Sequence, residues 1–349
     1  MPDSWLGNPV QTVDSAAREA ALERQNSLTK PPGSLGSLEQ IAVNLAGMQG
    51  RDRPRIDHCY ITVFAADHGV AAEGVSAFPQ VVTAEMVRNF ARGGAAISVL
   101  ARDTASTLEV VNLGTVVEIE PLQGVVDAVL GFGTANLAVE PAMTSEQLEG
   151  ALDQGRQAIG RALGQAADLF VGGEMGIANT TAASTLACLY LQQPAELLAG
   201  PGTGLDAGGV THKTGVIEKA LAMHGSYSHD PYEILRRAGG FEIAALAGAY
   251  ICAAQHGLPV IVDGFISSAA ALAAERIVPG VRNWMLLGHQ SAEPGHQMIL
   301  KELDLSPMLD LGMRLGEGSG AATAITLVRV ALALHNNMAT FAEAGVSGG

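Results

Sequence analysis

Short apolar segments without polar alternation recur along this chain, and most of them end at a glycine or a small polar residue. They lie at residues 60–65, 108–113, 128–131, 169–171, 259–262 and 284–287. A strand that is apolar throughout is typically buried on both faces, as in a parallel sheet covered by helices. The pattern therefore predicts a set of buried parallel strands.

Helical patterns fill the intervals between these strands. They cover residues 83–92, 95–102, 145–163, 182–191, 241–255 and 292–303. Thr144 and, three residues later, Gln147 form a capping-box pattern at the start of the third helix. Because strands and helices alternate, the sequence predicts an α/β fold of three layers, with a mainly parallel sheet flanked by helices.

The two ends of the chain have a different pattern. Residues 13–39 are helical and loop-like, and residues 321–344 are expected to form one long apolar helix that is too rich in alanine to be stable alone in water. We therefore expect the two ends to pack together. The predicted division is an α/β nucleotide-binding domain at residues 57–310 and a smaller helical domain formed by residues 1–56 together with residues 311–349.

Composition narrows the possible partners. The chain has 349 residues and a formal charge of −15, which argues against nucleic acid or an anionic membrane as a partner. The longest apolar segment, residues 243–254, is shorter than the about 20 residues that span a bilayer. Residues 1–5 lack the charged and apolar regions of a signal peptide. We expect a soluble, cytoplasmic protein.

Metal binding and covalent catalysis are not favoured. The cysteines Cys59, Cys188 and Cys252 have neither the spacing of a zinc site nor that of a disulfide framework, so buried thiols are the expected state. Asp67 and His68 could supply ligands, but the nine histidines form no pair four residues apart on a helix. The sequence also lacks the nucleophile elbow of serine hydrolases.

Polar residues follow four of the predicted strands, at Asp67-His68-Gly69, Gly173-Glu174, Asp263-Gly264-Phe265 and Gly288-His289-Gln290-Ser291. Ligands of parallel α/β folds bind at the carboxyl ends of the strands. These four loops are therefore expected to meet at one active site.

Two glutamates, Glu174 and Glu317, lie beside glycines where a helix is about to begin. A glycine-flanked carboxylate gains little packing, and its backbone can pass close to a ligand. The pair suggests general acid or base chemistry on a small anionic ligand. The alternative is that each glutamate only caps the neighbouring helix.

Two segments could bind an anion. Residues 200–209 are rich in glycine and precede Lys213, although His212 stands where a nucleotide-binding P-loop needs glycine. The alternative is an exposed loop with a surface lysine. Residues 176–179 could present free N–H groups at a helix start, unless Asn179 or Thr180 is simply the N-cap.

Seven segments in order along the chain carry a resemblance to a known family. They are residues 28–36, 66–70, 173–181, 239–242, 262–267, 291–293 and 313–322. Together they resemble the nicotinate-nucleotide–dimethylbenzimidazole phosphoribosyltransferases of cobalamin lower-ligand synthesis. The resemblance covers nearly the whole chain and is far more specific than a single glycine motif.

The resemblance implies a reaction. Nicotinate mononucleotide and 5,6-dimethylbenzimidazole would give α-ribazole 5′-phosphate and nicotinate, with inversion at C1′. It also implies a homodimer, small-molecule substrates as the only other partners, and no metal or other cofactor. The α/β domain and the small helical domain that it implies agree with the pattern of the chain.

The same resemblance implies roles for individual residues. Glu317 would be the general base, and Glu174 and Lys213 would hold and stabilise the nucleotide. The substrate-binding residues would be Phe78, Met86, Gly176, Asn179, Gly202, Thr203, Gly204, Asp263, Ser291 and Leu315. Among these, Gly176, Ser291 and the loop from Gly202 to Gly204 would cradle the phosphate and carboxylate, Asp263 would contact the ribose, and Leu315, Phe78 and Met86 would wall the benzimidazole pocket.

Two rival functions remain open at this point. In a nucleotide N-glycosidase, Glu317 would activate water, whereas an apolar wall at Phe78 and Met86 favours an aromatic acceptor. A nucleotide-binding module without chemistry would keep the glycine loops but would not require Glu317.

Overall fold

A computed structural model describes residues 5–347 of the chain. Its centre is a sheet of seven parallel strands in the order β3-β2-β1-β4-β5-β6-β7. The strands are β1 Cys59–Ala66, β2 Thr107–Gly114, β3 Val125–Asp127, β4 Leu169–Met175, β5 Val260–Val262, β6 Met285–His289 and β7 Pro307–Leu309. The predicted α/β class and the parallel sheet are confirmed. Strands β1 and β4 are buried along almost their whole length, which explains their continuous apolar sequences.

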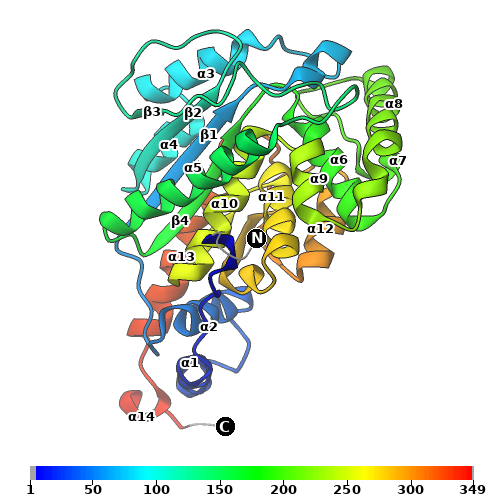
Figure 1. The fold of residues 1–349 in the computed structure, drawn as a ribbon. Helices are drawn as coiled ribbons and strands as arrows, with labels where there is room; N and C mark the ends of the chain where they lie inside the picture. Colours follow the sequence, from blue (N-terminus) through cyan, green and yellow to red (C-terminus); the bar gives the residue numbers. More distant parts are fainter. Residues whose placement is uncertain (1–4, 348–349) are drawn as a thin grey trace.

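Helices cover the sheet (Figure 1). They are α1 Ser15–Ser27, α2 Ser37–Gln49, α3 Val81–Arg92, α4 Ala96–Asp103, α5 Ser145–Gly164, α6 Asn179–Leu191, α7 Ala195–Leu198, α8 Ala207–His224, α9 Pro231–Ala238, α10 Phe241–His256, α11 Phe265–Ile277, α12 His296–Leu303, α13 Ser319–Asn337 and α14 Phe341–Ala344. Short 3₁₀ helices occur at Trp5–Gly7, Gly69–Glu73, Gly225–Tyr227 and Val281–Trp284. Helix α10 packs against β1, β4, α5 and α11, while α13 packs against β6, β4 and α4.

Several expected elements have different bounds. Residues 128–131 are not a strand; the third strand is the shorter β3, just before them. The predicted helix at 292–303 begins four residues later, at His296, after Pro294. No pattern in the sequence predicted β7, a half-buried edge strand, and the expected single helix at 321–344 is divided into α13 and α14. Thr340 causes this division, since its side chain and Glu343 form a capping box that starts a new helix.

Helix α8 corrects the interpretation of residues 200–209 as one loop. The loop ends at Asp206, whose side chain accepts a hydrogen bond from the backbone N–H of Gly209 and caps α8. Gly208 and Gly209 therefore lie in the first turn of a helix. Three further helices, α7, α9 and α11, were also not expected from the sequence, nor was most of α2.

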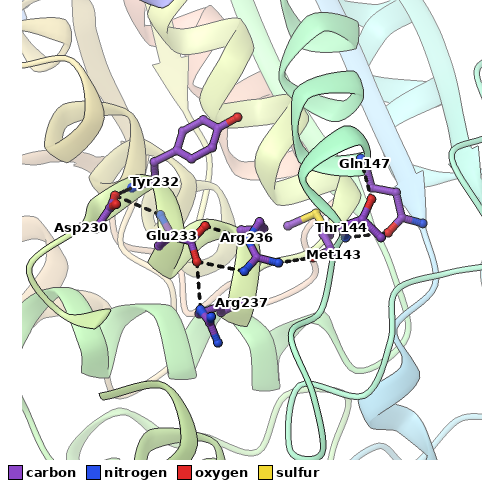
Figure 2. Close-up of polar contacts among 8 residues, drawn as sticks. All are labelled: Met143, Thr144, Gln147, Asp230, Tyr232, Glu233, Arg236 and Arg237. Carbon is purple, nitrogen blue, oxygen red and sulfur yellow. Dashed lines mark hydrogen bonds and ion pairs between the residues drawn. The ribbon is translucent and has the colours of Figure 1, made fainter. Parts of the chain in front are cut away.

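The capping box at Thr144 is confirmed, and the residue before it contacts a second helix, α9 (Figure 2). The Thr144 side chain accepts from the Gln147 N–H, and the Gln147 side chain accepts from the Thr144 N–H. The neighbouring carbonyl of Met143 accepts a 2.9 Å hydrogen bond from Arg236 of α9. Arg236 is held in turn by Glu233 (Figure 2), so the start of α5 is fixed to the last turn of α9.

The two chain ends pack together, as Figure 1 shows for α1, α2 and the end of α13. Arg24 of α1 donates to the carbonyls of His335, Asn336 and Met338, which lie at the end of α13 where carbonyls lack partners within the helix. Leu28 and Thr340 form an isolated antiparallel bridge. The domain limits at residues 57 and 310 stay a prediction, and residues 1–4 and 348–349 of that prediction lie outside the described residues.

In residues 5–347, no helix is long and apolar enough to cross a membrane. The three cysteines are free and buried, as expected. The expectation that residues 1–5 lack the features of a signal peptide is not tested by the structure, because residues 1–4 lie outside the described range.

Helices α5 and α10 approach each other so closely that their backbones touch at two glycines. A methyl group on Gly155 would overlap the Ala245 carbonyl oxygen and come within 2.5 Å of the Ala249 nitrogen. At Gly248 a methyl group would collide with the backbone of Leu152. No side chain fits at either glycine, because the obstructing atoms belong to the backbone of the facing helix and cannot move independently of that helix.

We expect Gly155→Ala to lower the free energy of unfolding by about 1–3 kcal/mol, because the added methyl group must separate two packed helices. Gly160→Ala in the same helix is the matched control: position 160 is exposed and has no neighbour within 4 Å. There alanine should raise stability by up to about 1 kcal/mol through helix propensity. Thermal denaturation of both variants measures this, and equal effects would contradict the packing argument.

Candidate active site

The order of the strands places a ligand site between β1 and β4. The chain moves outward from β1 to β2 and β3 on one side, and from β4 to β7 on the other. At such a switch point the loops after adjacent strands diverge and leave a crevice at the carboxyl ends. The loops after β4, β5 and β6 border one cavity of about 260 Å³ there.

The cavity wall combines apolar, polar and charged side chains. Its lining residues are Phe78, Glu174, Met175, Gly176, Ile177, Asn179, Thr180, Gly202, Thr203, Asp263, Gly264, Phe265, Ile266, His289, Ser291, Glu293, Arg314, Leu315 and Gly316. Nine of the thirteen residues predicted for the site are among them. Glu317, Lys213, Met86 and Gly204 are not.

Glu317 lies directly behind this wall, in a strained backbone conformation. Its φ angle is +65°, which side-chain-bearing residues rarely adopt. The backbone is held from two sides: the Glu317 N–H donates to the Glu174 carbonyl at 3.2 Å, and Gly173 lies so close that a side chain there would collide with the Glu317 carbonyl. Gly318, not Glu317, is the N-cap residue of α13, so Glu317 does not cap the helix that follows it.

Glu317 is only 5% exposed, and its carboxyl group faces the start of α4. The Oε2 atom accepts a 3.4 Å hydrogen bond from the Ile97 N–H. Burial raises the pKa of Glu317 above its usual value, and the nearby Asp263 carboxylate acts in the same direction, while the Ile97 N–H acts against it. Such a group can accept a proton near neutral pH more readily than an exposed glutamate.

Glu174 ends β4 beneath the loop that carries Glu317. A side chain at Gly316 would collide with the Glu174 carboxyl group, so the two segments can meet only because residue 316 is glycine, with φ +88°. Asn179 donates a short hydrogen bond to Glu174 Oε2. Burial raises the pKa of Glu174 well above its usual value, and the carboxylates of Glu242 and Asp263 add to the rise. Glu174 does not cap α6, whose N-cap residue is Ala178.

The turn between β4 and α6 is fixed by a hydroxyl group. Thr83 donates to Asp67 Oδ1 at 2.6 Å and accepts from the Ile177 N–H at 3.1 Å. The next residue, Ala178, has φ +75°. The fully buried Thr83 and Asp67 therefore shape the loop and hold Gly176 and Asn179 at the cavity.

Asp263 and Ser291 line the cavity, but both also make internal bonds. Asp263 accepts from the N–H groups of Gly318 and Ala321 at the start of α13. The Ser291 N–H donates to His296 Nδ1 at 2.8 Å. His296 is fully buried; burial, together with the neighbouring His289, lowers its pKa to about 3, so the ring is neutral.

Lys213 is not the surface lysine of the alternative interpretation. It lies on α8, is fully buried, and donates from Nζ to Thr180 Oγ1 at 2.9 Å and to the Gly200 carbonyl at 3.2 Å. Burial lowers its pKa to about 8. A methyl group on Gly202 would be 3.4 Å from Nζ, so the ammonium group lies immediately behind the cavity wall. Gly204 is exposed and borders no part of this cavity.

Only two of the three apolar side chains expected to line the benzimidazole pocket border the cavity. Phe78 and Leu315 line the cavity but are 52% and 58% exposed. Met86 is half-buried against the core and is not in the cavity wall. The burial of Glu317 therefore comes from Gly173 and the start of α4 more than from these three side chains. Ile177, Phe265 and Ile266 supply further apolar surface that the sequence interpretation did not nominate.

Two charged residues of the cavity, Arg314 and Glu293, were not among the predicted site residues, whereas His289 lies in a loop already expected at the site. Among the described residues, Arg314 is the one lysine or arginine in the cavity wall, and its Nη1 donates to the Gly202 carbonyl at 3.0 Å. Glu293 accepts from the Gly202 N–H, and His289 lies 3.7 Å from Asp263. Arg314 could have been found, since it immediately precedes Leu315 in a motif already noted. Within residues 5–347, no group of three or more His, Cys, Asp or Glu side chains has the arrangement of a metal site.

Comparison with known proteins agrees with this architecture. A family model described as phosphoribosyltransferase matches residues 10–346. The chain is 58% identical over 343 residues to a nicotinate-nucleotide–dimethylbenzimidazole phosphoribosyltransferase of Pseudomonas aeruginosa strain UCBPP-PA14, covering 98% of each chain. It is 58% identical over 347 residues to the protein of the same name from Pseudomonas syringae pv. syringae, covering 99% of each.

A solved structure extends the comparison to the fold. The crystal structure of the enzyme of that name from Thermus thermophilus superimposes with a TM-score of 0.91 at 44% sequence identity, covering 96% of this chain and 100% of that one. The protein is thus an enzyme of the pentosyltransferase class. The chain belongs to the family of nicotinate-nucleotide–dimethylbenzimidazole phosphoribosyltransferases, as its motifs predicted.

Proposed function

We propose that this enzyme transfers the phosphoribosyl group of nicotinate mononucleotide to 5,6-dimethylbenzimidazole. The products are α-ribazole 5′-phosphate and nicotinate, with inversion at C1′. The names of the relatives support the substrates. The observation that carries the chemistry is the Glu317 carboxyl group, buried beside the cavity with a raised pKa.

The proposed step needs a base but no general acid. The nicotinate nitrogen already carries a positive charge in the substrate, so the C1′–N bond can break with both electrons going to that nitrogen. The free nitrogen of the benzimidazole forms the new bond to C1′ from the opposite face, which inverts the configuration. The attacking ring becomes positively charged, and its remaining N–H proton passes to the Glu317 carboxylate.

The proposed phosphate site is the end of the cavity around Gly202 and Thr203. The loop offers backbone groups there, Arg314 supplies a guanidinium group at the cavity wall, and Lys213 lies behind it. Gly176 and Asn179 border the same cavity at the start of α6. Glu174 and Asp263 would then face the ribose and the cationic ring, whose positive charge they complement.

An N-glycosidase would use the same carboxylate to activate water. The apolar residues Ile177, Phe265 and Ile266 favour an aromatic acceptor instead, since a hydrolase needs only a wet site. The deciding experiment measures nicotinate release from nicotinate mononucleotide with and without 5,6-dimethylbenzimidazole, in the presence of a chelator. Release only with the base supports the transferase; release without it would establish a hydrolase.

We also propose that the enzyme is a homodimer, which the resemblance implies. Exposed apolar side chains at Val129, Phe132 and Val139, between β3 and α5, are candidates for a subunit contact. Sedimentation of the full-length chain tests this proposal.

Glu317→Gln should reduce kcat by about 100-fold or more, because the amide cannot accept the proton. Nicotinate mononucleotide should still bind with nearly unchanged affinity, since the substitution preserves shape and the loop contacts are made by the backbone. Calorimetry and steady-state kinetics separate the two effects. Glu149→Gln, at an exposed position of α5, is the control. Turnover that survives in Glu317→Gln would refute the base assignment.

The pH profile of kcat should show an acid limb above the pKa of an ordinary glutamate. Burial raises the pKa of Glu317, the base acts only when ionised, and activity therefore rises as pH increases through that raised pKa. Asp263→Asn should move the limb to lower pH, because the Asp263 carboxylate contributes to the rise. If the acid limb came from titration of the benzimidazole, this substitution would not move it. An acid limb at the same pH in Asp263→Asn would therefore assign the limb to the substrate rather than to Glu317.

Arg314→Met should raise the KM for nicotinate mononucleotide by about tenfold or more, as expected for a lost charge-assisted hydrogen bond to phosphate. Its kcat should change less than its KM, since the guanidinium binds ground state and transition state alike. Arg18→Met, at an exposed position of α1, is the matched control. A larger effect on kcat than on KM would place Arg314 at the reacting atoms instead.

A further inference from the structure

A chain of hydrogen bonds leads from the buried core to the loop at Gly202. The ring of His296 bonds to Ser268 Oγ at 2.9 Å and accepts from the Ser291 N–H. The acceptor role of Nδ1 leaves the proton on Nε2, which donates to Ser268. Ser291 Oγ then accepts from the Glu293 N–H at 3.3 Å. The loop between β6 and α12 therefore has a fixed conformation.

Glu293 is the last member of this chain. Its Oε1 accepts a 2.9 Å hydrogen bond from the Gly202 N–H, and Arg314 donates to the carbonyl of the same glycine. A side chain at Gly200 would collide with Glu293 Oε2. Both polar groups of the Gly202 backbone are thus held by charged side chains that border the cavity.

Glu293 also acts on the ammonium group of Lys213, which is buried behind that loop. Lys213 itself contacts uncharged atoms of the neighbouring segments: the Thr180 hydroxyl of α6 and the Gly200 carbonyl. On α8, His212 is directed away to the Glu73 carbonyl. Burial lowers the pKa of Lys213 to about 8, and the Glu293 carboxylate opposes this fall. Within the described residues, Glu293 Oε2 has no hydrogen-bond partner although it is buried.

We propose that Glu293 is a positioning residue of the phosphate site, which fixes the Gly202 loop through its backbone and keeps Lys213 in the charged form. This inference rests on the proposed function, because it takes the nucleotide phosphate as the anion that the loop and Lys213 receive.

The two roles of Glu293 can be separated by substitution. Glu293→Gln keeps an oxygen that can accept from the Gly202 N–H but removes the charge that favours the Lys213 ammonium. Glu293→Met keeps a similar length but removes both. Glu218→Gln is the charge-matched control, since Glu218 is an exposed residue of the same helix as Lys213.

The readout is the KM for nicotinate mononucleotide between about pH 6.5 and 9.5, the range in which a lysine of lowered pKa titrates and the phosphate is mostly a dianion. The wild-type KM should rise as pH increases through the pKa of Lys213, because the neutral amine no longer attracts phosphate. Loss of the carboxylate lowers that pKa, so the rise should occur at lower pH in Glu293→Gln. The ratio of variant to wild-type KM should therefore increase with pH, to about tenfold near pH ~8.5.

Glu293→Met should show the same pH-dependent increase together with a further loss at every pH, because the loop is no longer fixed. Glu218→Gln should follow the wild type throughout. A Glu293→Gln ratio that is flat across the range would overturn the charge role, and equal KM values for the Met and Gln variants would overturn the loop role. If the wild type releases no nicotinate, the proposed function itself fails. That result comes from the wild type alone, so it is distinct from a failure of the Glu293 proposal, which shows only in the variants.

Discussion

The position of the loop that carries Glu317 depends on one buried carboxyl group, that of Asp263. Asp263, which follows β5 and is 1% exposed, accepts from the backbone N–H groups of Gly318 and Ala321 at 3.2 and 2.8 Å. These groups belong to the first turn of α13, where no carbonyl within the helix can accept from them and where the helix dipole favours a negative charge. The sheet thereby holds the start of a helix that lies far along the chain from β5. Glu317 is carried into position over β4 as a consequence.

The same arrangement brings four carboxyl groups together. Glu174, Asp263, Glu317 and Glu242 are all nearly or fully buried in one region, and the pKa values of the first three are raised chiefly by burial. Two histidines lie beside them: His68 bonds to Glu242 at 2.6 Å, and His289 lies 3.7 Å from Asp263. A ligand with a cationic ring would favour the ionised forms of these carboxyl groups, whereas a neutral ring would not. For the proposed reaction, this favours the nucleotide over the nicotinate that leaves.

The sequence predicts those features that depend on local pattern. Apolar runs identified β1, β2, β4, β5 and β6, and the polar residues after β1, β4, β5 and β6 marked the edge at which the site lies. Features that depend on tertiary contacts could not be predicted from the sequence. Lys213 could not be recognised as buried, because its helix has Gly208 and Gly209 in its first turn and forms through the Asp206 cap and packing against α6. Met86 was predicted as a pocket residue from the family resemblance, yet its side chain packs against the core.

Backbone strain gives independent support for a functional role of position 317. A positive φ costs a residue with a side chain about 1–3 kcal/mol, and glycine adopts it without that cost. Gly316 and Gly318 have the same sign of φ, so glycine at 317 would suit the loop better than glutamate. The strain is retained because the Glu174 carbonyl and Asp263 fix the loop from below. What the chain gains from a glutamate there is a carboxyl group that faces the start of α4, accepts one N–H and has a pKa raised by burial. The proposed proton transfer would explain why this position carries a glutamate, although glycine would suit the backbone better.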